Sequence, residues 1–158
     1  IYGGMGRKLV LRLKHGDRQE IARPAAGWMH HSVKTILTKN TIIAPVPLHW
    51  MRLAKRRYNQ SALIAKNLAE LSGLELCPDA LQRMKRTPSL EGKTQQQRAE
   101  ILKGAVNVNA KRRHRIIGRP VLLVDDVMTT GATAAECTRV LLAAGAGRVD
   151  VGIQGQGG

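Results

Sequence analysis

The chain has 158 residues, a formal net charge of +15 at pH 7 and no phenylalanine, so one domain with a core of Leu, Ile, Val and Ala is expected. No apolar run approaches the roughly 20 residues that a membrane-spanning helix needs, and such a helix is excluded. The cysteines, Cys77 and Cys137, are too far apart to indicate a zinc site, and nothing indicates a disulfide framework, so a cytoplasmic location is expected.

The positive charge is concentrated in two parts of the chain. Residues 1–60 carry twelve Lys and Arg against two acids, and residues 101–120 carry six against none. A field of this size favours polyanions such as nucleic acid, or a highly charged small substrate. A basic surface that only keeps the protein in solution is the alternative.

The first forty residues give one ambiguous element and one helix. Residues 1–16 fit a helix or a strand, because their apolar residues recur at both spacings. Residues 17–38 are predicted to be mainly helical, with Pro24 near the start of the helix or at a break. The core candidates in this helix are Trp28, Ile36 and Leu37.

A short strand and a basic loop follow. Residues 41–44 are predicted to form a buried strand, and the loop after it has four cations between residues 52 and 57. If the sheet is parallel, this loop leaves the edge at which such sheets bind their ligands. Arg57 is the best candidate there for a charge-assisted contact with an anion. A solvated basic loop is the ordinary alternative.

The middle of the chain continues the α/β pattern. Asn59 is a predicted N-cap, and the helix after it ends at Gly73, which completes a strand-loop-helix unit. A short strand at residues 81–84 and a long polar loop at 85–94 come next, and Pro, Ser and Gly indicate that the loop is mobile. The basic run at 110–119 fits either a turn before a strand or a nucleic-acid contact.

The most informative stretch is residues 121–133. Its first four residues are branched and apolar, which predicts a strand buried on both faces of a parallel sheet. Asp125 and Asp126, here called the acid pair, follow at the end where open α/β sheets bind ligands. The phosphate loop comes next, a turn that can direct backbone N–H groups and a helix N-terminus at a phosphate; its residues are Thr129, Thr130, Gly131, Ala132 and Thr133. A ribose 5-phosphate suits both features.

Three other interpretations fit parts of this stretch. A solvated turn followed by a Thr-capped helix explains each piece separately, but not their occurrence together in this order. A receiver domain needs most of its length after such a strand, and only 32 residues follow Asp126. A Walker-type nucleotide loop is excluded, because no Gly-Lys-Ser/Thr follows the glycine.

Two blocks of the sequence carry a family resemblance. Residues 121–133 resemble the phosphoribosyl pyrophosphate (PRPP) signature of the type I phosphoribosyltransferases. Residues 45–48 (Pro-Val-Pro-Leu) with 57–60 (Arg-Tyr-Asn-Gln) resemble the Pro-Val-Pro…Arg-Gly-Phe-Asn-Gln block of the competence protein F (ComF) family, although the Gly is missing and Tyr58 replaces Phe. The resemblance implies an α/β, type I phosphoribosyltransferase-like fold, with a parallel sheet of about five strands and helices on both faces.

Weaker matches extend the resemblance along the chain. Arg98 and Asn107 match positions usual in the ComF family, and the similarity covers about residues 1–153. All of residues 1–158 is expected to be one phosphoribosyltransferase-like domain. The chain begins with Ile1 and has no counterpart of the zinc-binding cysteine cluster usual before this domain, so a fragment without that module is expected.

The resemblance also implies roles for the residues. Asp125 and Asp126 would hold the ribose hydroxyls of PRPP and stabilise positive charge on the ring, and residues 129–133 would bind the 5-phosphate. The pyrophosphate would be bound by Pro47, Leu48 and Arg57. Mg²⁺ would be held through the substrate rather than by a dedicated protein site, with the acid pair as the only candidate protein ligands. The expected reaction transfers the phosphoribosyl group to a nitrogen nucleophile and releases pyrophosphate.

The acceptor, and catalysis itself, stay open at this stage. Thr129 stands where the 6-oxopurine salvage enzymes have an Asp that acts on the purine, which disfavours that reaction. The chain could also bind PRPP without transfer, or bind single-stranded DNA, since the ComF family is associated with DNA uptake. Four aromatic residues offer few stacking platforms, so DNA binding would be mostly electrostatic. A homodimer is an alternative to a monomer.

Overall fold

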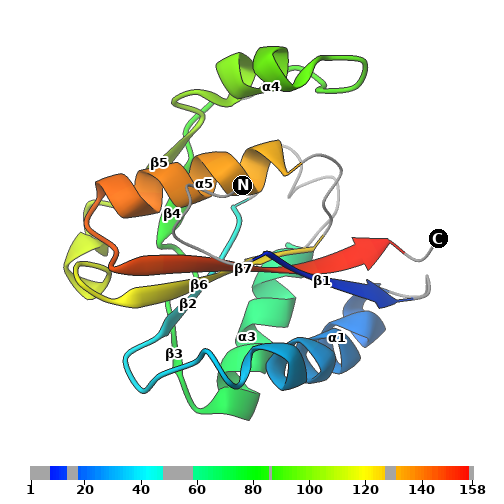
Figure 1. The fold of residues 1–158 in the computed structure, drawn as a ribbon, viewed down its shortest axis with the longest axis vertical. Coiled ribbons are helices and arrows are strands. Elements are labelled where there is room, and N and C mark those ends of the chain that lie inside the picture. Colours follow the sequence, from blue (N-terminus) through cyan, green and yellow to red (C-terminus); the bar gives the residue numbers. More distant parts are fainter. Residues whose placement is uncertain (1–7, 14–17, 48–58, 86, 127–130, 157–158) are drawn as a thin grey trace.

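A parallel sheet of five strands lies at the centre of the protein in its computed structural model, with helices on both faces (Figure 1). The structure describes residues 8–13, 18–47, 59–85, 87–126 and 131–156. Within these ranges, no helix is both long enough and apolar enough to cross a membrane. The α/β fold expected from the sequence is confirmed.

The order of the strands places β6 in the middle of the sheet. From edge to edge the order is β1-β7-β6-β2-β3, and every neighbouring pair is parallel. Leu123 of β6 lies opposite Ala44 of β2 and Val151 of β7. Because parallel strands end at the same edge, the ends of β2 and β6 lie side by side. The five strands are β1 (Lys8–Leu13), β2 (Ile42–Pro45), β3 (Glu75–Leu76), β6 (Pro120–Asp125) and β7 (Arg148–Gln156).

The position of β1 settles an alternative that periodicity left open. Residues 1–16 fitted a helix or a strand equally, and residues 8–13 form a strand along β7. The pairing runs in register from Lys8 opposite Val151 to Leu13 opposite Gln156. Side-chain spacing does not decide the conformation of residues 8–13. Backbone pairing with the neighbouring strand β7 does.

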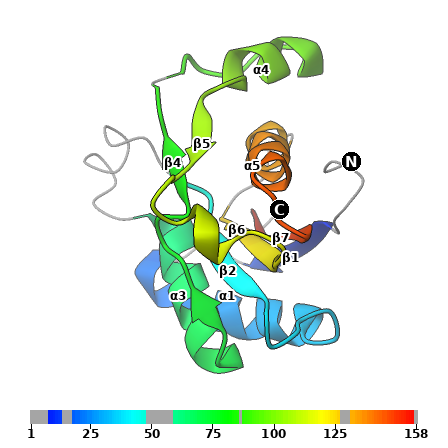
Figure 2. The ribbon, with the colours of Figure 1, turned by 90° about the vertical axis from the view of Figure 1, so that its left-hand side faces the viewer.

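One face of the sheet is covered by α1 (Arg18–Val33) and α3 (Gln60–Ser72), which also pack against each other (Figures 1 and 2). α3 begins at the predicted N-cap Asn59 and ends at Gly73, which has a left-handed φ of 71°. α1 approaches β7 closely, since a Cβ at Gly152 would lie 2.7 Å from the Met29 sulfur. The core on this face includes Met29, Ile43, Ile64, Leu68, Leu122 and Val124.

The other face is covered by α5 (Ala132–Ala143) and by a two-stranded antiparallel sheet beside it (Figure 2). The strand predicted at residues 81–84 is present, but it pairs with a neighbour outside the parallel sheet, because β4 and β5 hydrogen-bond to each other. α4 lies beyond α5, on the side away from the parallel sheet (Figure 1). These elements are β4 (Leu81–Arg83), α4 (Gln95–Leu102), β5 (Val106–Val108) and the 3-10 helix η1 (Arg113–Arg115).

Two predictions for the first helix are wrong. Trp28, a predicted core residue, is 63% exposed. Pro24 lies inside α1, which continues without a break to Val33. Packing against α3 and the sheet maintains α1 despite the backbone N–H that proline lacks. Ile36 and Leu37 are partly buried against the core. Trp28 lies outside the buried stripe of α1, which consists of Ala22, Ala25, Ala26, Met29 and Val33.

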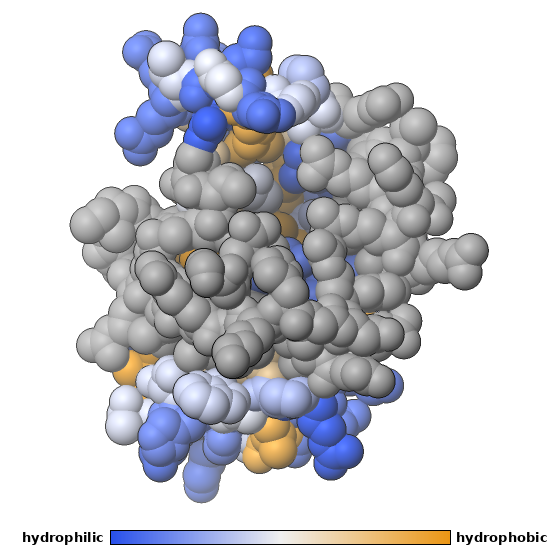
Figure 3. Space-filling model, turned by 90° about the vertical axis from the view of Figure 1, so that its right-hand side faces the viewer, coloured by the Kyte–Doolittle hydropathy of each residue, from blue (hydrophilic) through white to orange (hydrophobic). Residues whose placement is uncertain are grey.

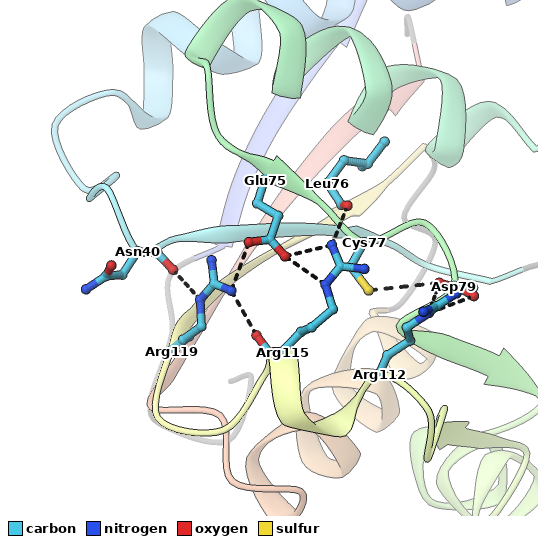
Figure 4. A network of polar contacts seen from close by, with 8 residues as sticks. All are labelled: Asn40, Glu75, Leu76, Cys77, Asp79, Arg112, Arg115 and Arg119. Carbon is cyan, nitrogen blue, oxygen red and sulfur yellow. Dashed lines mark hydrogen bonds and ion pairs between the residues drawn. The ribbon is translucent and has the colours of Figure 1, made fainter.

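The edge at which the strands begin is held by a polar network (Figure 4). The Glu75 carboxylate accepts hydrogen bonds from Arg115 Nε at 2.7 Å and from Arg119 Nη1 at 3.0 Å. Asp79 accepts from Arg112 Nε at 3.0 Å. Three arginines of the run at 110–119 therefore connect η1 and the start of β6 to β3 and to the segment after β3. Of the two interpretations predicted for this run, the turn before a strand is present.

Candidate functional site

The ends of β2 and β6 form the centre of the candidate site. The Val46 N–H donates to the Val124 carbonyl at 2.8 Å, which continues the pairing of the two strands one step past β2. Pro47 comes next on one strand and the acid pair on the other. Asp125 is the last residue of β6 and is 7% exposed, whereas Asp126 is half-buried.

The two aspartates face different helices. Side chains alternate along a strand, so Asp125 shares the face of Leu123, which α5 covers. The Cys137 thiol on α5 is close enough to feel the charge of Asp125, as this placement requires. Burial raises the pKa of that thiol, and the charge of Asp125 raises it further. Asp126 shares the face of Leu122, which α1 and α3 cover. The carboxylates thus lie on either side of the end of the central strand.

The start of α3 is hydrogen-bonded to the ends of both strands. Asn59 caps α3 by accepting from the Ala62 N–H at 3.3 Å, and its amide donates to the Val46 carbonyl at 3.2 Å. Ser61 Oγ accepts from the Asp126 N–H at 2.9 Å and donates to Asp126 Oδ1 at 3.4 Å. The sequence predicted the cap but missed Ser61, because its partner lies 65 residues further along the chain.

The N-terminus of α5 differs from those of α3 and α4. α3 is capped by Asn59, and α4 by a capping box between Thr94 and Gln97. α5 follows Gly131, which has a left-handed φ of 81°, and no side-chain cap is present there among the described residues. A helix N-terminus is a place at which proteins commonly bind an anion such as a phosphate.

The loop between β4 and α4 is held by two arginines. Arg83 Nη2 donates to Thr87 Oγ1 at 2.7 Å, and Arg98 Nε donates to the Leu90 carbonyl at 3.1 Å. Arg98 therefore has a backbone partner of its own within the loop. Viewed from the side at which the strands end, hydrophobic residues are visible below the hydrophilic outer surface of α4 (Figure 3).

The described residues include part of the predicted site. Leu48, Arg57, Thr129 and Thr130 lie outside the described residues. The predicted site residues that the structure brings to this edge are Pro47, Asp125, Asp126, Gly131, Ala132 and Thr133.

The described part of this edge contains two candidate metal ligands, the carboxylates of the acid pair. In the described ranges, no group of three or more His, Cys, Asp or Glu side chains gathers to hold a metal ion. Two adjacent carboxylates fit the oxygen preference of Mg²⁺ but would fill only part of its octahedral shell.

Comparison with curated proteins gives two named relatives. The chain is 29% identical to Competence protein F of Haemophilus influenzae and 31% identical to the DNA utilization protein YhgH of Escherichia coli K12. Both similarities run over 148 residues, which is 90% of this chain and 64% and 63% of those proteins, so the chain spans just under two thirds of their length. No family model matches the chain. The resemblance to the ComF family is confirmed.

Comparison with solved structures shows the fold. The glutamine PRPP amidotransferase from B. subtilis superposes with a TM-score of 0.54 at 20% identity, covering 84% of this chain and 26% of that one. The protein TT1426 from Thermus thermophilus gives a TM-score of 0.52 at 18% identity, covering 89% and 74%. At such identities the likeness concerns the fold alone, which is that of the type I phosphoribosyltransferases.

Proposed function

We propose that this chain, which is homologous to Competence protein F over nine tenths of its length, binds PRPP with Mg²⁺ and transfers the phosphoribosyl group to a nitrogen nucleophile. The observation that carries the proposal is the order of features at the end of the central strand. The acid pair ends β6, and α5 begins shortly after it, directly behind the left-handed Gly131. An anion site beside two carboxylates matches a ribose 5-phosphate, which needs both.

Each part of PRPP has a partner in this arrangement. The phosphate loop and the N-terminus of α5 take the 5-phosphate, and the carboxylates of Asp125 and Asp126 accept hydrogen bonds from the ribose hydroxyls. Pro47, Leu48 and Arg57 follow the neighbouring strand β2 and take the pyrophosphate. Mg²⁺, when bound, neutralises charge on the pyrophosphate, with substrate oxygens and waters as most of its ligands.

The reaction exchanges one bond at C1 of the ribose for another. The C1–O bond to pyrophosphate breaks, and its electron pair leaves with the pyrophosphate. Positive charge develops on the ring, and the carboxylates of the acid pair stabilise it. The lone pair of a nitrogen nucleophile then forms the new C1–N bond, and the proton that this nitrogen loses goes to water.

The first test is calorimetric titration of Mg²⁺-PRPP into the wild type and the double variant Asp125→Asn/Asp126→Asn. The amides keep the shape but lose the charge, so we expect affinity to fall by more than about tenfold, which is 1.4 kcal/mol. Asp79→Asn makes the same chemical change at a carboxylate that lies outside the proposed site and accepts from Arg112, and it should leave the affinity unchanged. No measurable binding by the wild type, or equal binding by the double variant, would overturn the proposal.

Catalysis needs its own measurement. Pyrophosphate release from Mg²⁺-PRPP is followed while nitrogen nucleophiles, such as ammonia and free nucleobases, are added in turn. Release that depends on one nucleophile, and that is lost in Asp125→Asn/Asp126→Asn, supports transfer. Binding without any release would leave a PRPP-binding protein and exclude transfer to the nucleophiles supplied.

A second candidate function is binding of single-stranded DNA. The observation that favours it is the net charge of +15 together with exposed cations on the edge opposite the proposed PRPP site, including Lys111 and Arg113. The names of the two relatives, Competence protein F and DNA utilization protein YhgH, point in the same direction. The measurement that tests it is the salt dependence of oligonucleotide affinity.

A further inference from the structure

We infer that Ser61 is the positioning residue of the acid pair, because it fixes Asp126 through both its backbone and its carboxylate. The inference rests on the proposed PRPP site. Ser61 is 3% exposed, and its hydroxyl contacts Asp126 twice, as an acceptor from the N–H at 2.9 Å and as a donor to Oδ1 at 3.4 Å. A serine hydroxyl has one proton, so donating it to Oδ1 leaves the lone pairs for the N–H. The shorter of the two bonds is the stronger.

Asp126 lies just past the pairing of β6 with β2. β2 ends at Pro45, opposite Val124, and the last backbone bond across this pair joins Val46 to Val124. Asp126 is half-buried, and a buried N–H without an acceptor would be costly. The side chain of an α3 residue accepts from this N–H, so a helix helps to set the position of Asp126.

The same few residues also join the acid pair to the basic loop. α3 begins at Gln60, directly after the segment that contains Arg57. Asn59 ties this start to Val46, and Ser61 ties it to Asp126. The start of α3 is therefore hydrogen-bonded both to the end of β2 and to the acid pair.

The test compares Ser61→Ala with the wild type for Mg²⁺-PRPP affinity. Loss of the hydroxyl removes two hydrogen bonds that orient Asp126, and we expect affinity to fall on the order of tenfold. Ser72→Ala is the matched control, since Ser72 lies in the same helix and bonds only to helix carbonyls and the Leu74 N–H at the far end. It should leave the affinity unchanged. Equal affinity of Ser61→Ala and wild type would overturn the inference.

A second background separates positioning from general damage. In Asp126→Ala the carboxylate is absent, so adding Ser61→Ala should change PRPP affinity by less than about twofold, while it still lowers stability through the lost backbone bond. A further tenfold loss in this background would mean that Ser61 acts by another route. Ser61→Cys keeps the shape with a weaker donor, so its PRPP affinity should be lower than that of the wild type, and this comparison remains available if the alanine variant unfolds.

The outcome can be separated from the fate of the proposed function. If the wild type binds Mg²⁺-PRPP but Ser61→Ala binds equally well, positioning is wrong and the PRPP site stands. If the wild type does not bind PRPP, the function is wrong, and the hydrogen bond itself is read from amide exchange. The Asp126 amide should then exchange faster in Ser61→Ala than in Ser72→Ala, and equal protection would overturn the contact as well.

Discussion

Gly131 lies between the acid pair and α5 with a φ of 81°, a backbone conformation that residues with a Cβ adopt only at a cost. This glycine directs the chain from the end of the central strand into the first turn of the helix. The N–H groups of that turn are the ones that the proposed site uses. The conformation of a single residue therefore orients the end of the site at which we propose that the phosphate binds.

Gly131→Ala should lower both stability and PRPP affinity. We expect the free energy of unfolding to fall by about 1–2 kcal/mol, because alanine in the left-handed region is strained. Gly27→Ala in α1 is the control, since no atom lies within 4 Å of an added Cβ and alanine favours a helix by about 1 kcal/mol over glycine. Urea unfolding and calorimetry measure the two effects. Equal stability of both variants would contradict this account.

Single residues of the site differ in how well the sequence identifies them. Asp125, Asp126 and the cap Asn59 were found from local patterns, since each belongs to a strand end or helix start that a few neighbours define. Ser61 was missed, because nothing near it in the chain shows that an aspartate 65 residues later needs an acceptor. Trp28 was assigned to the core by its type alone, and it is exposed.

At the scale of elements, β3, η1 and the start of β6 are joined by the Glu75 carboxylate. Arg115 and Arg119 both donate to it, and Arg119 also donates to the Asn40 carbonyl at 2.9 Å before β2. Burial raises the pKa of Glu75, but the hydrogen bonds from these two arginines outweigh burial and hold that pKa below its usual value of 4.5. The network fixes the edge of the sheet opposite the proposed site.

Glu75→Gln should destabilise the protein in a pH-dependent way. Because the pKa of Glu75 is lower in the folded protein than its usual value of 4.5, the ionised carboxylate stabilises the folded state at any pH above 4.5. This stabilisation is lost as the pH falls through the lower, folded-state pKa. Glu75 is 40% exposed, so we expect about 1 kcal/mol at pH 7 after screening. Urea unfolding from pH 7 to pH 3 should show the difference from wild type vanish. A constant difference would contradict the charge argument.

Whole elements were predicted well where their signals are local. α3 runs between the predicted cap Asn59 and the predicted stop Gly73, because caps and a left-handed glycine act within one turn. The strand at residues 81–84 was predicted too, yet it joins β5 in a separate antiparallel pair. Pairing partners are distant in sequence, so the strand could be predicted and its sheet could not.

For the whole molecule, the two proposed functions are assigned to opposite edges of one sheet. The proposed PRPP site lies where the strands end. Exposed cations that precede β6, among them Lys111 and Arg113, lie where the strands begin. The two proposed functions therefore use different surfaces, and a change at one surface should leave the other unaffected.

Single-stranded DNA binding should weaken steeply with salt. Each phosphate contact contributes about −0.7 to the slope of log affinity against log salt, so Lys111→Ala/Arg113→Ala should make the slope shallower by about 1.4. The same variant should bind Mg²⁺-PRPP like the wild type, since both changes lie at the opposite edge from the proposed site. Fluorescence anisotropy with a labelled oligonucleotide measures the slope. Affinity that is flat across salt, or a slope that the double variant leaves unchanged, would contradict an electrostatic DNA role at this edge.

By itself, the sequence determined the fold class, the central strand with its acid pair, and the residues Asn59 and Gly73 at which α3 begins and ends. These features depend on residues within a few positions of one another, and side-chain spacing and backbone preference act over that range. The tertiary structure alone decided that residues 8–13 form a strand, that Trp28 is exposed, and that Ser61 holds Asp126. Each depends on which distant segment lies alongside, because a backbone group or side chain finds its partner only after the sheet and helices have assembled.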